Sequence, residues 1–169
     1  YPAEEFSARR EAMKHKPSVF SLGLDWLKAQ DAIKRLKAQG AELGPTVRLL
    51  DVGCGAGGFL RAMREQVNVE PRGVDFNPVC SEFASEVYGV EVDVGDLADQ
   101  AYSDGQFDIV SSWHCLEHTF EPELELAEIR RVLRPDGWLV LEIPTPGFWA
   151  RLFRGRWLFL QAPTHLFHL

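Results

Sequence analysis

The spacing of apolar residues along the chain alternates between a helical and a strand-like period. In residues 21–39, apolar side chains recur every three to four positions from Trp26 to Leu36, which predicts an amphipathic helix that Gly40 can end. Residues 47–52 form a nearly continuous apolar run of strand length, as is typical of a strand covered on both faces. The pattern thus predicts a helix followed by a buried strand.

This alternation continues to residue 143. Asn77 and Pro78 fit the N-cap and the first position of a helix, directly after a short strand that ends at residues 73–75. The further expected strands are 90–94, 107–112 and 138–143, the further expected helices are 59–67, 78–88 and 123–133, and residues 135–137 are expected to turn. Strands that alternate with helices imply right-handed crossovers and a parallel sheet. The predicted fold class is α/β, with a doubly wound, mostly parallel sheet.

Glycines cluster directly after the first predicted strand. In doubly wound sheets, ligands bind outside the carboxyl ends of the strands, where the strand order reverses. Gly53, Gly55 and Gly58 fit the G-x-G-x-x-G loop of dinucleotide sites, with an acidic residue about 20 positions beyond. Gly53, Gly55 and Gly57, preceded by Asp51, fit equally the loop of an S-adenosylmethionine site. The glycines alone therefore predict a nucleoside ligand without deciding which one.

The charge around this loop separates the two ligands. A dinucleotide brings a doubly charged pyrophosphate, which Asp51 would repel, whereas S-adenosylmethionine brings a cationic sulfonium and an α-amino group that an acid favours. Asp75 is placed to accept hydrogen bonds from both ribose hydroxyls. Asp96 is placed to accept from the adenine amine, and Leu97 to offer its backbone N–H to a ring nitrogen. The ordered set favours S-adenosyl-L-methionine as the cofactor.

Six segments resemble, in order, the successive motifs of class I S-adenosylmethionine-dependent methyltransferases. They are residues 49–58 (LLDVGCGAGG), 73–75 (GVD), 95–97 (GDL), 107–110 (FDIV), 116–118 (LEH) and 133–139 (LRPDGWL). The chain is most similar to the type 11 and type 23 small-molecule branch, which contains the ubiquinone-biosynthesis O-methyltransferases. The resemblance implies a Rossmann-like methyltransferase fold and methyl transfer to a small-molecule acceptor, for which we expect a hydroxyl oxygen.

The expected cofactor-binding residues follow the first four strands. They are Asp51, Gly53, Cys54, Gly55, Gly57, Asp75, Phe76, Asp96, Leu97, Ser112 and Trp113. The last two are expected to form the wall beside the methionine moiety. Two other functions would use much the same loop: an NAD-dependent oxidoreductase, against which Asp51 and Asp96 count, and a non-catalytic module that binds a nucleoside without turnover.

Two histidines follow the fourth strand on the expected cofactor side. If the acceptor is a hydroxyl, a base within hydrogen-bond reach assists the transfer, and the ordinary pKa of histidine suits that role near neutral pH. His118 and His114 are therefore the candidate catalytic residues, although His118 could instead cap or pack at the next helix. No metal site is expected, because Cys115 with these histidines matches no zinc spacing.

Composition narrows the class of protein further. The 169 residues can bury one self-sufficient core, and 46% apolar with 25% charged residues is ordinary for a globular domain. A formal net charge of −7 disfavours nucleic acid as a partner, and three cysteines without C-x-x-C spacing indicate reduced thiols. Residues 1–20 lack an apolar signal-peptide centre, so we expect a cytoplasmic protein. The sequence leaves the oligomeric state open.

The chain is expected to have three parts. Residues 1–44 form an N-terminal arm and helix, residues 45–146 the S-adenosylmethionine-binding core, and residues 147–169 a basic and aromatic lid or substrate-side segment. This last segment could instead pack as an amphipathic helix or touch a membrane surface, and its short length disfavours the membrane. The chain starts without Met and stops before the last two strands of the family fold, so we expect part of a longer protein.

Overall fold

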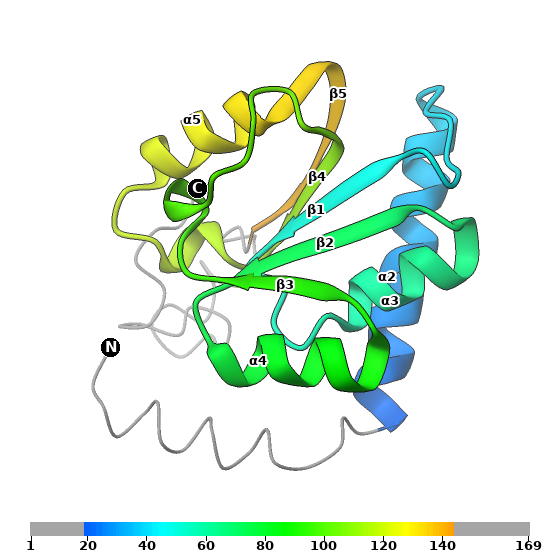
Figure 1. Cartoon of the computed structure of the whole chain (residues 1–169). Coiled ribbons are helices and arrows are strands. Elements are labelled where there is room, and N and C mark those ends of the chain that lie inside the picture. Colours follow the sequence, from blue (N-terminus) through cyan, green and yellow to red (C-terminus); the bar gives the residue numbers. More distant parts are fainter. Residues whose placement is uncertain (1–18, 144–169) are drawn as a thin grey trace, which may run out of the picture.

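The computed structural model describes residues 19–143, with side chains from residue 23 onward (Figure 1). The elements are, in chain order, α2 (Val19–Ala38), β1 (Arg48–Val52), α3 (Gly58–Val67), β2 (Glu70–Asp75), α4 (Pro78–Phe83), the π-helical turn η1 (Ala84–Tyr88), β3 (Glu91–Val94), the 3-10 turn η2 (Leu97–Asp99), β4 (Phe107–Trp113), the 3-10 turn η3 (Leu116–His118), α5 (Pro122–Val132) and β5 (Leu133–Glu142). The expected lid at residues 147–169 lies outside the described residues.

The five strands form one parallel sheet in the order β3-β2-β1-β4-β5. The chain builds the sheet outward from β1 to β3, crosses back to the other side of β1, and builds outward again through β4 to β5. The strand order therefore reverses between β1 and β4, and the crevice at their carboxyl ends is where such sheets bind ligands. The predicted α/β, doubly wound, parallel fold is confirmed.

Helices cover both faces of the sheet, and each face has its own core. Helices α2 and α3 lie on one face and α5 lies on the other (Figure 1). Consecutive residues of the central strands point to opposite faces: Leu49 and Ile109 join the cluster under α2 and α3, whereas Leu50 and Val110 join the cluster under α5. Four of the five residues of β1 are buried, and three of these four are apolar, as is typical of a strand covered on both faces.

Two elements differ from their expected form. The helix expected over residues 78–88 is α4 continued by the π-helical turn η1, and Gly89 ends it with a left-handed φ of 61°. The turn expected at residues 135–137 interrupts β5, because Leu133 pairs with Phe107 and the register then jumps to Trp138 opposite Ile109. Residues 134–137, between these two pairs, form an irregularity within the strand. The strand β5 therefore begins at Leu133, earlier than predicted.

The apolar residues of α5 do not all face the sheet. Leu124, near the start of the helix, is 58% exposed. Ile129 and Val132, one and two turns further along, carry the packing of α5 on the sheet instead. Leu124 lies beside a cavity, described below, and so belongs to the surface of a candidate site.

Candidate functional site

The glycine loop follows β1 and turns sharply into α3. Gly53, Gly55 and Gly57 all have positive φ angles, of 71°, 53° and 74°, which side chains with a Cβ rarely adopt. At Gly53 a Cβ would lie only 2.5 Å from the Cys115 sulfur, so the absence of a side chain lets the loop pack against the residues after β4. At Gly55 a Cβ would point into open space, which leaves this stretch of backbone accessible to a ligand.

Asp51 is the last acid of β1 and is buried, with 2% exposure. Its Oδ1 accepts a 2.7 Å hydrogen bond from the hydroxyl of Ser111 on β4. Burial raises the pKa of Asp51 to about 7, although the hydrogen bond from Ser111 and the charge of Lys28 both lower it. The site therefore contains a carboxyl group that can carry a negative charge near neutral pH.

Asp75 ends β2 and ties the glycine loop to the next helix. One carboxylate oxygen accepts a 2.8 Å hydrogen bond from the backbone N–H of Gly55, and the other accepts 2.9 Å from that of Asn77. Asn77 in turn caps α4, because its side chain accepts from the N–H of Val79 over 3.0 Å. The predicted N-cap is confirmed, and the acid expected to face the ribose also fixes the loop beside it. Burial raises the pKa of Asp75, against the effect of these two hydrogen bonds.

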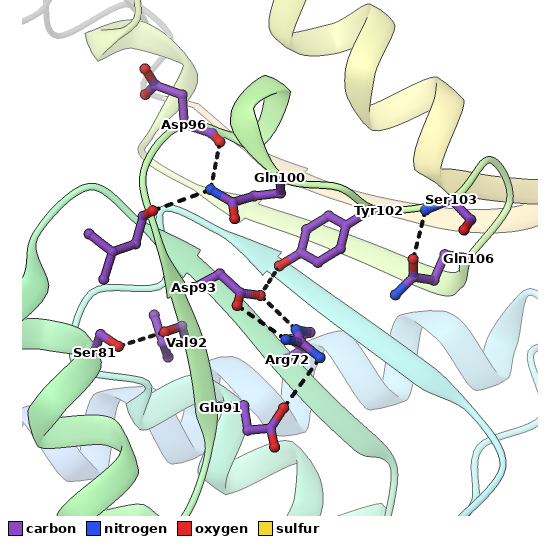
Figure 2. Close-up of polar contacts among 11 residues, drawn as sticks. Arg72, Ser81, Glu91, Val92, Asp93, Asp96, Gln100, Tyr102, Ser103 and Gln106 are labelled. Atoms are coloured by element: carbon purple, nitrogen blue, oxygen red, sulfur yellow. Dashed lines mark hydrogen bonds and ion pairs between the residues drawn. The ribbon is translucent and has the colours of Figure 1, made fainter.

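Asp96 directly precedes η2, after β3, and its backbone is fixed by a hydrogen bond within the turn. The side-chain amide of Gln100 donates to the carbonyl oxygens of Asp96 and Val94, over 3.0 and 3.3 Å (Figure 2). The carboxylate of Asp96 is exposed and forms no cap hydrogen bond, while Leu97 beside it is buried. The backbone of this turn is therefore fixed, and its carboxylate is left for another partner.

A second set of contacts supports this turn from the strands behind it. The guanidinium of Arg72 on β2 contacts both oxygens of Asp93 on β3, and the hydroxyl of Tyr102 also donates to Asp93 (Figure 2). The hydrogen bonds from Arg72 hold the pKa of Asp93 below its usual range. Because Tyr102 follows η2 and the other two lie on neighbouring strands, the network connects the end of η2 to the sheet.

A cavity of about 420 Å³ opens beside these strand ends. Phe76, Asp96 and Leu97, three of the predicted cofactor residues, line it together with His118. The remaining lining residues are Ala98, Cys115, Thr119, Phe120, Glu121, Leu124, Glu125 and Glu128. The structure thus brings together residues from the ends of β2, β3 and β4, as expected for parallel strands whose carboxyl ends meet at one edge.

Ser112 and Trp113 end β4 next to the glycine loop. Ser112 is fully buried, and neither its hydroxyl nor the indole N–H of Trp113 has a hydrogen-bond partner in the described part of the chain. The Trp113 ring packs edge-on against Phe59 of α3, with 5.0 Å between ring centroids. Buried polar atoms without partners are rare in folded proteins and call for an explanation such as a ligand.

Helix α2 supplies two charged residues that sequence patterns did not single out. Lys28 places its Nζ 5.1 Å from the centre of the Trp113 ring and lies close enough to Asp51 to lower its pKa. Asp25 lies against the first residue of α3, since a Cβ at Gly58 would be 2.1 Å from its carboxylate. Only the packing of α2 on α3 brings these residues to the loop, so no motif around residue 51 could have indicated them.

The two candidate catalytic histidines have different surroundings. His118 lines the cavity. His114 is half exposed, and its ring lies between two glutamates: Nε2 is 2.9 Å from Glu142 Oε1, and Nδ1 is 3.5 Å from Glu117 Oε1. Cys54 was predicted to bind the cofactor. Its sulfur points toward Gly73 of β2, so its side chain packs on the sheet.

Among residues 19–143, no three or more His, Cys, Asp or Glu side chains are grouped so that they could hold a metal ion. Within the same range, no helix combines the length and apolar character needed to cross a membrane.

Known proteins share both the sequence pattern and the fold. A family model described as a methyltransferase domain matches residues 25–169. The chain is 32% identical over 100 residues to ajmaline N-methyltransferase of Rauvolfia serpentina. The aligned region covers 55% of this chain and 34% of that protein. It is 30% identical over 101 residues to chloroplastic tocopherol O-methyltransferase of Arabidopsis thaliana, with 56% and 29% coverage. The chain thus spans about a third of the length of these curated relatives.

The fold also matches a solved structure. Phosphoethanolamine N-methyltransferase 2 of Haemonchus contortus, in complex with S-adenosyl-L-methionine, has a TM-score of 0.61 and 24% identity, over 70% of this chain and 28% of that chain. At this identity the likeness shows a shared fold.

Proposed function

The chain belongs to the methyltransferase domain family, as its motifs predicted, and we propose on this basis that it transfers a methyl group from S-adenosyl-L-methionine to a small-molecule acceptor. The single observation that carries the proposal is the convergence of Asp51, Asp75 and Asp96 at the carboxyl ends of three adjacent strands. The closer likeness to ubiquinone-biosynthesis O-methyltransferases stays a prediction.

The residues of the site fit this cofactor in size and in chemistry. The backbone at Gly55 faces open space, and the cavity of about 420 Å³ at the ends of β2, β3 and β4 is large enough for a nucleoside. The hydroxyl of Ser112 and the indole N–H of Trp113 are buried at the end of β4 and have no hydrogen-bond partner within the described residues. An acid at Asp51 suits a cation and opposes a pyrophosphate.

Each part of the cofactor then has residues to hold it. Asp75 would accept hydrogen bonds from the ribose hydroxyls with the lone pairs that Gly55 and Asn77 leave free. Asp96, with Phe76 and Leu97 beside it, would hold the adenine in the cavity. Lys28, which lies near both Asp51 and Trp113, would attract the methionine carboxylate.

The chemistry needs alignment more than it needs reactive protein groups. S-adenosylmethionine supplies a methyl group activated by a positively charged sulfur. Because the charge disperses as the methyl leaves, much of the rate can come from holding the acceptor in line in a dry pocket. We propose a hydroxyl oxygen as the acceptor atom, with His114 or His118 as the group that receives its proton. We further propose that residues 147–169 cover the acceptor side.

Calorimetry tests the cofactor, and labelled methyl transfer tests the reaction. Titration with S-adenosylmethionine and S-adenosylhomocysteine should release or absorb heat, and titration with NAD should not. Radiolabelled methyl groups should then pass from S-adenosylmethionine to hydroxylated small molecules. Binding of NAD alone would favour the oxidoreductase, and binding of both sulfur nucleosides without transfer to any acceptor would favour the non-catalytic module.

A further inference from the structure

We propose that Glu117 is a positioning residue that holds His114 as the proton acceptor for the substrate hydroxyl. The accepting ring nitrogen is Nε2, which Glu142 occupies until the substrate arrives. This inference rests on the proposed function and deepens it, because it assigns the base and the residues that orient it.

The inference begins with the buried carboxylate of Glu117. The residue is 2% exposed, and neither carboxylate oxygen has a hydrogen-bond partner in residues 19–143. A buried carboxylate without donors is costly, and natural proteins keep such groups where they serve a function. The nearest charged partner is the His114 ring, whose Nδ1 lies 3.5 Å from Oε1. This separation is longer than a hydrogen bond.

The backbone of His114 has an unusual conformation. Its φ of 51° is left-handed, which costs energy for a residue with a Cβ and is tolerated best by Asn, Asp and His. Its backbone N–H donates 2.8 Å to the carbonyl of Glu142, which continues the pairing of β4 with β5 beyond Trp113. The backbone therefore fixes where the ring sits, and Glu142 is the glutamate at hydrogen-bond distance from it.

A further observation is the location of this ring. The cavity extends from the ends of β2 and β3 to residues 115–121 after β4. His114 and Glu142 are not among its lining residues, and they stand next to it at the ends of β4 and β5, which we assign to the acceptor. Glu142 is half exposed and accepts from Nε2–H, so its carboxylate can move away when the ring proton shifts to Nδ1 and a hydroxyl donates to Nε2.

The roles of the two ring nitrogens follow from their neighbours. A proton on Nδ1 faces the buried carboxylate of Glu117, which leaves the lone pair of Nε2 for the substrate. The acceptor O–H proton passes to Nε2, and its bonding electron pair stays on oxygen. That oxygen bonds to the methyl carbon as the carbon–sulfur bond breaks, with its pair retained by sulfur. The resulting imidazolium then faces Glu117, whose charge stabilises it.

The test compares Glu117→Gln with Glu123→Gln, an exposed glutamate of α5 outside the cavity. The first readout needs no turnover: ring ¹⁵N chemical shifts of His114 report which nitrogen carries the proton. In the free wild type the neutral ring should carry its proton on Nε2, which faces Glu142. With S-adenosylhomocysteine and catechol bound, the proton should move to Nδ1, toward Glu117. Glu117→Gln should keep the proton on Nε2 in this complex, and Glu123→Gln should show the wild-type change.

The second readout is methyl transfer to phenols, with catechol as the first probe. Glu117→Gln should lower kcat by about 10- to 100-fold while KM for S-adenosylmethionine and the affinity for S-adenosylhomocysteine stay within about twofold. His114→Asn, which tolerates the left-handed backbone, should lose as much, and the double variant should lose no more. This second variant keeps the inference testable if Glu117→Gln folds poorly.

Failure of this inference is distinct from failure of the proposed function. If the wild type transfers methyl groups to phenols and Glu117→Gln does so at the same rate, or if the proton of His114 does not respond, Glu117 does not position the base. Transfer to amines but to no phenol would also overturn the assignment. If the wild type binds neither sulfur nucleoside, the proposed function itself fails.

Discussion

Ser111 on β4 donates a 2.7 Å hydrogen bond to Asp51 on β1, and the two residues are register partners in the sheet. Both side chains are buried at the junction where the strand order reverses. The hydrogen bond offsets only part of the cost of burial, so the pKa of Asp51 remains raised to about 7. The charge at the centre of the candidate site therefore changes across the neutral pH range.

Asp51→Asn should stabilise the protein above pH 7. In the unfolded chain Asp51 ionises near its ordinary value of 3.8, and in the folded chain it ionises near 7, so its burial destabilises the fold increasingly between these values and fully above them. Asn can still accept from Ser111 and carries no charge. Urea unfolding at pH 8 should show a gain of about 1 to 4 kcal/mol, which vanishes near pH 4. An equal gain at both pH values would contradict the assigned cause.

The preference for S-adenosylmethionine over S-adenosylhomocysteine should rise with pH. The two ligands differ by the positive charge on sulfur, which an ionised Asp51 attracts, and ionisation increases as pH passes through about 7. Between pH 6 and pH 8 the ratio of the two affinities should grow roughly three- to tenfold in the wild type. Calorimetry on Asp51→Asn is the control, and its ratio should be flat. A ratio that rises equally in the variant would place the titrating group elsewhere.

Gly55→Ala should impair binding far more than stability. Gly55 and Gly89 share left-handed φ angles of 53° and 61°, and a Cβ at either would meet no atom within 4 Å. Each substitution should therefore cost about 1 kcal/mol of stability from backbone strain. Only Gly55→Ala should weaken S-adenosylhomocysteine binding, by tenfold or more, because its methyl group would occupy space reserved for the ligand. Comparable affinities in the two variants would show that the loop does not approach the ligand at Gly55.

Gln100→Ala should loosen the turn that carries Asp96. The Gln100 amide bridges the carbonyls of Val94 and Asp96, whereas Gln106 makes a similar local contact with the backbone N–H of Ser103, away from the cavity. Both substitutions remove exposed hydrogen bonds and should cost about 1 kcal/mol or less. S-adenosylhomocysteine binding should weaken roughly three- to tenfold in Gln100→Ala and stay unchanged in Gln106→Ala. An unchanged affinity in both would remove the turn from the site.

Local signals predicted most of the fold. The buried strand β1, the capped start of α4 and the alternation of strands with helices all follow from patterns within about ten residues. The π-helical turn at residues 84–88 and the interruption of β5 at residues 134–137 do not, because both depend on how one element meets its neighbours in the sheet.

The candidate site was predictable where one motif holds one role. Asp75 and Asp96 follow strands, and their place at the sheet edge follows from the parallel topology alone. Lys28 reaches the site only through the packing of α2. The role that we propose for Glu117 depends on its burial beside His114. Neither fact is encoded in local spacing.

The two hydrogen bonds accepted by Asp75 have a practical consequence for anyone who wants an inactive version of this protein. Substituting that acid would remove the ribose contact that we propose, but it would also release the amides of Gly55 and Asn77, so any lost activity would be confounded with a rearranged loop and a loosened helix start. His114→Asn leaves both of these hydrogen bonds in place, so it is the cleaner variant for testing the proposed acceptor side.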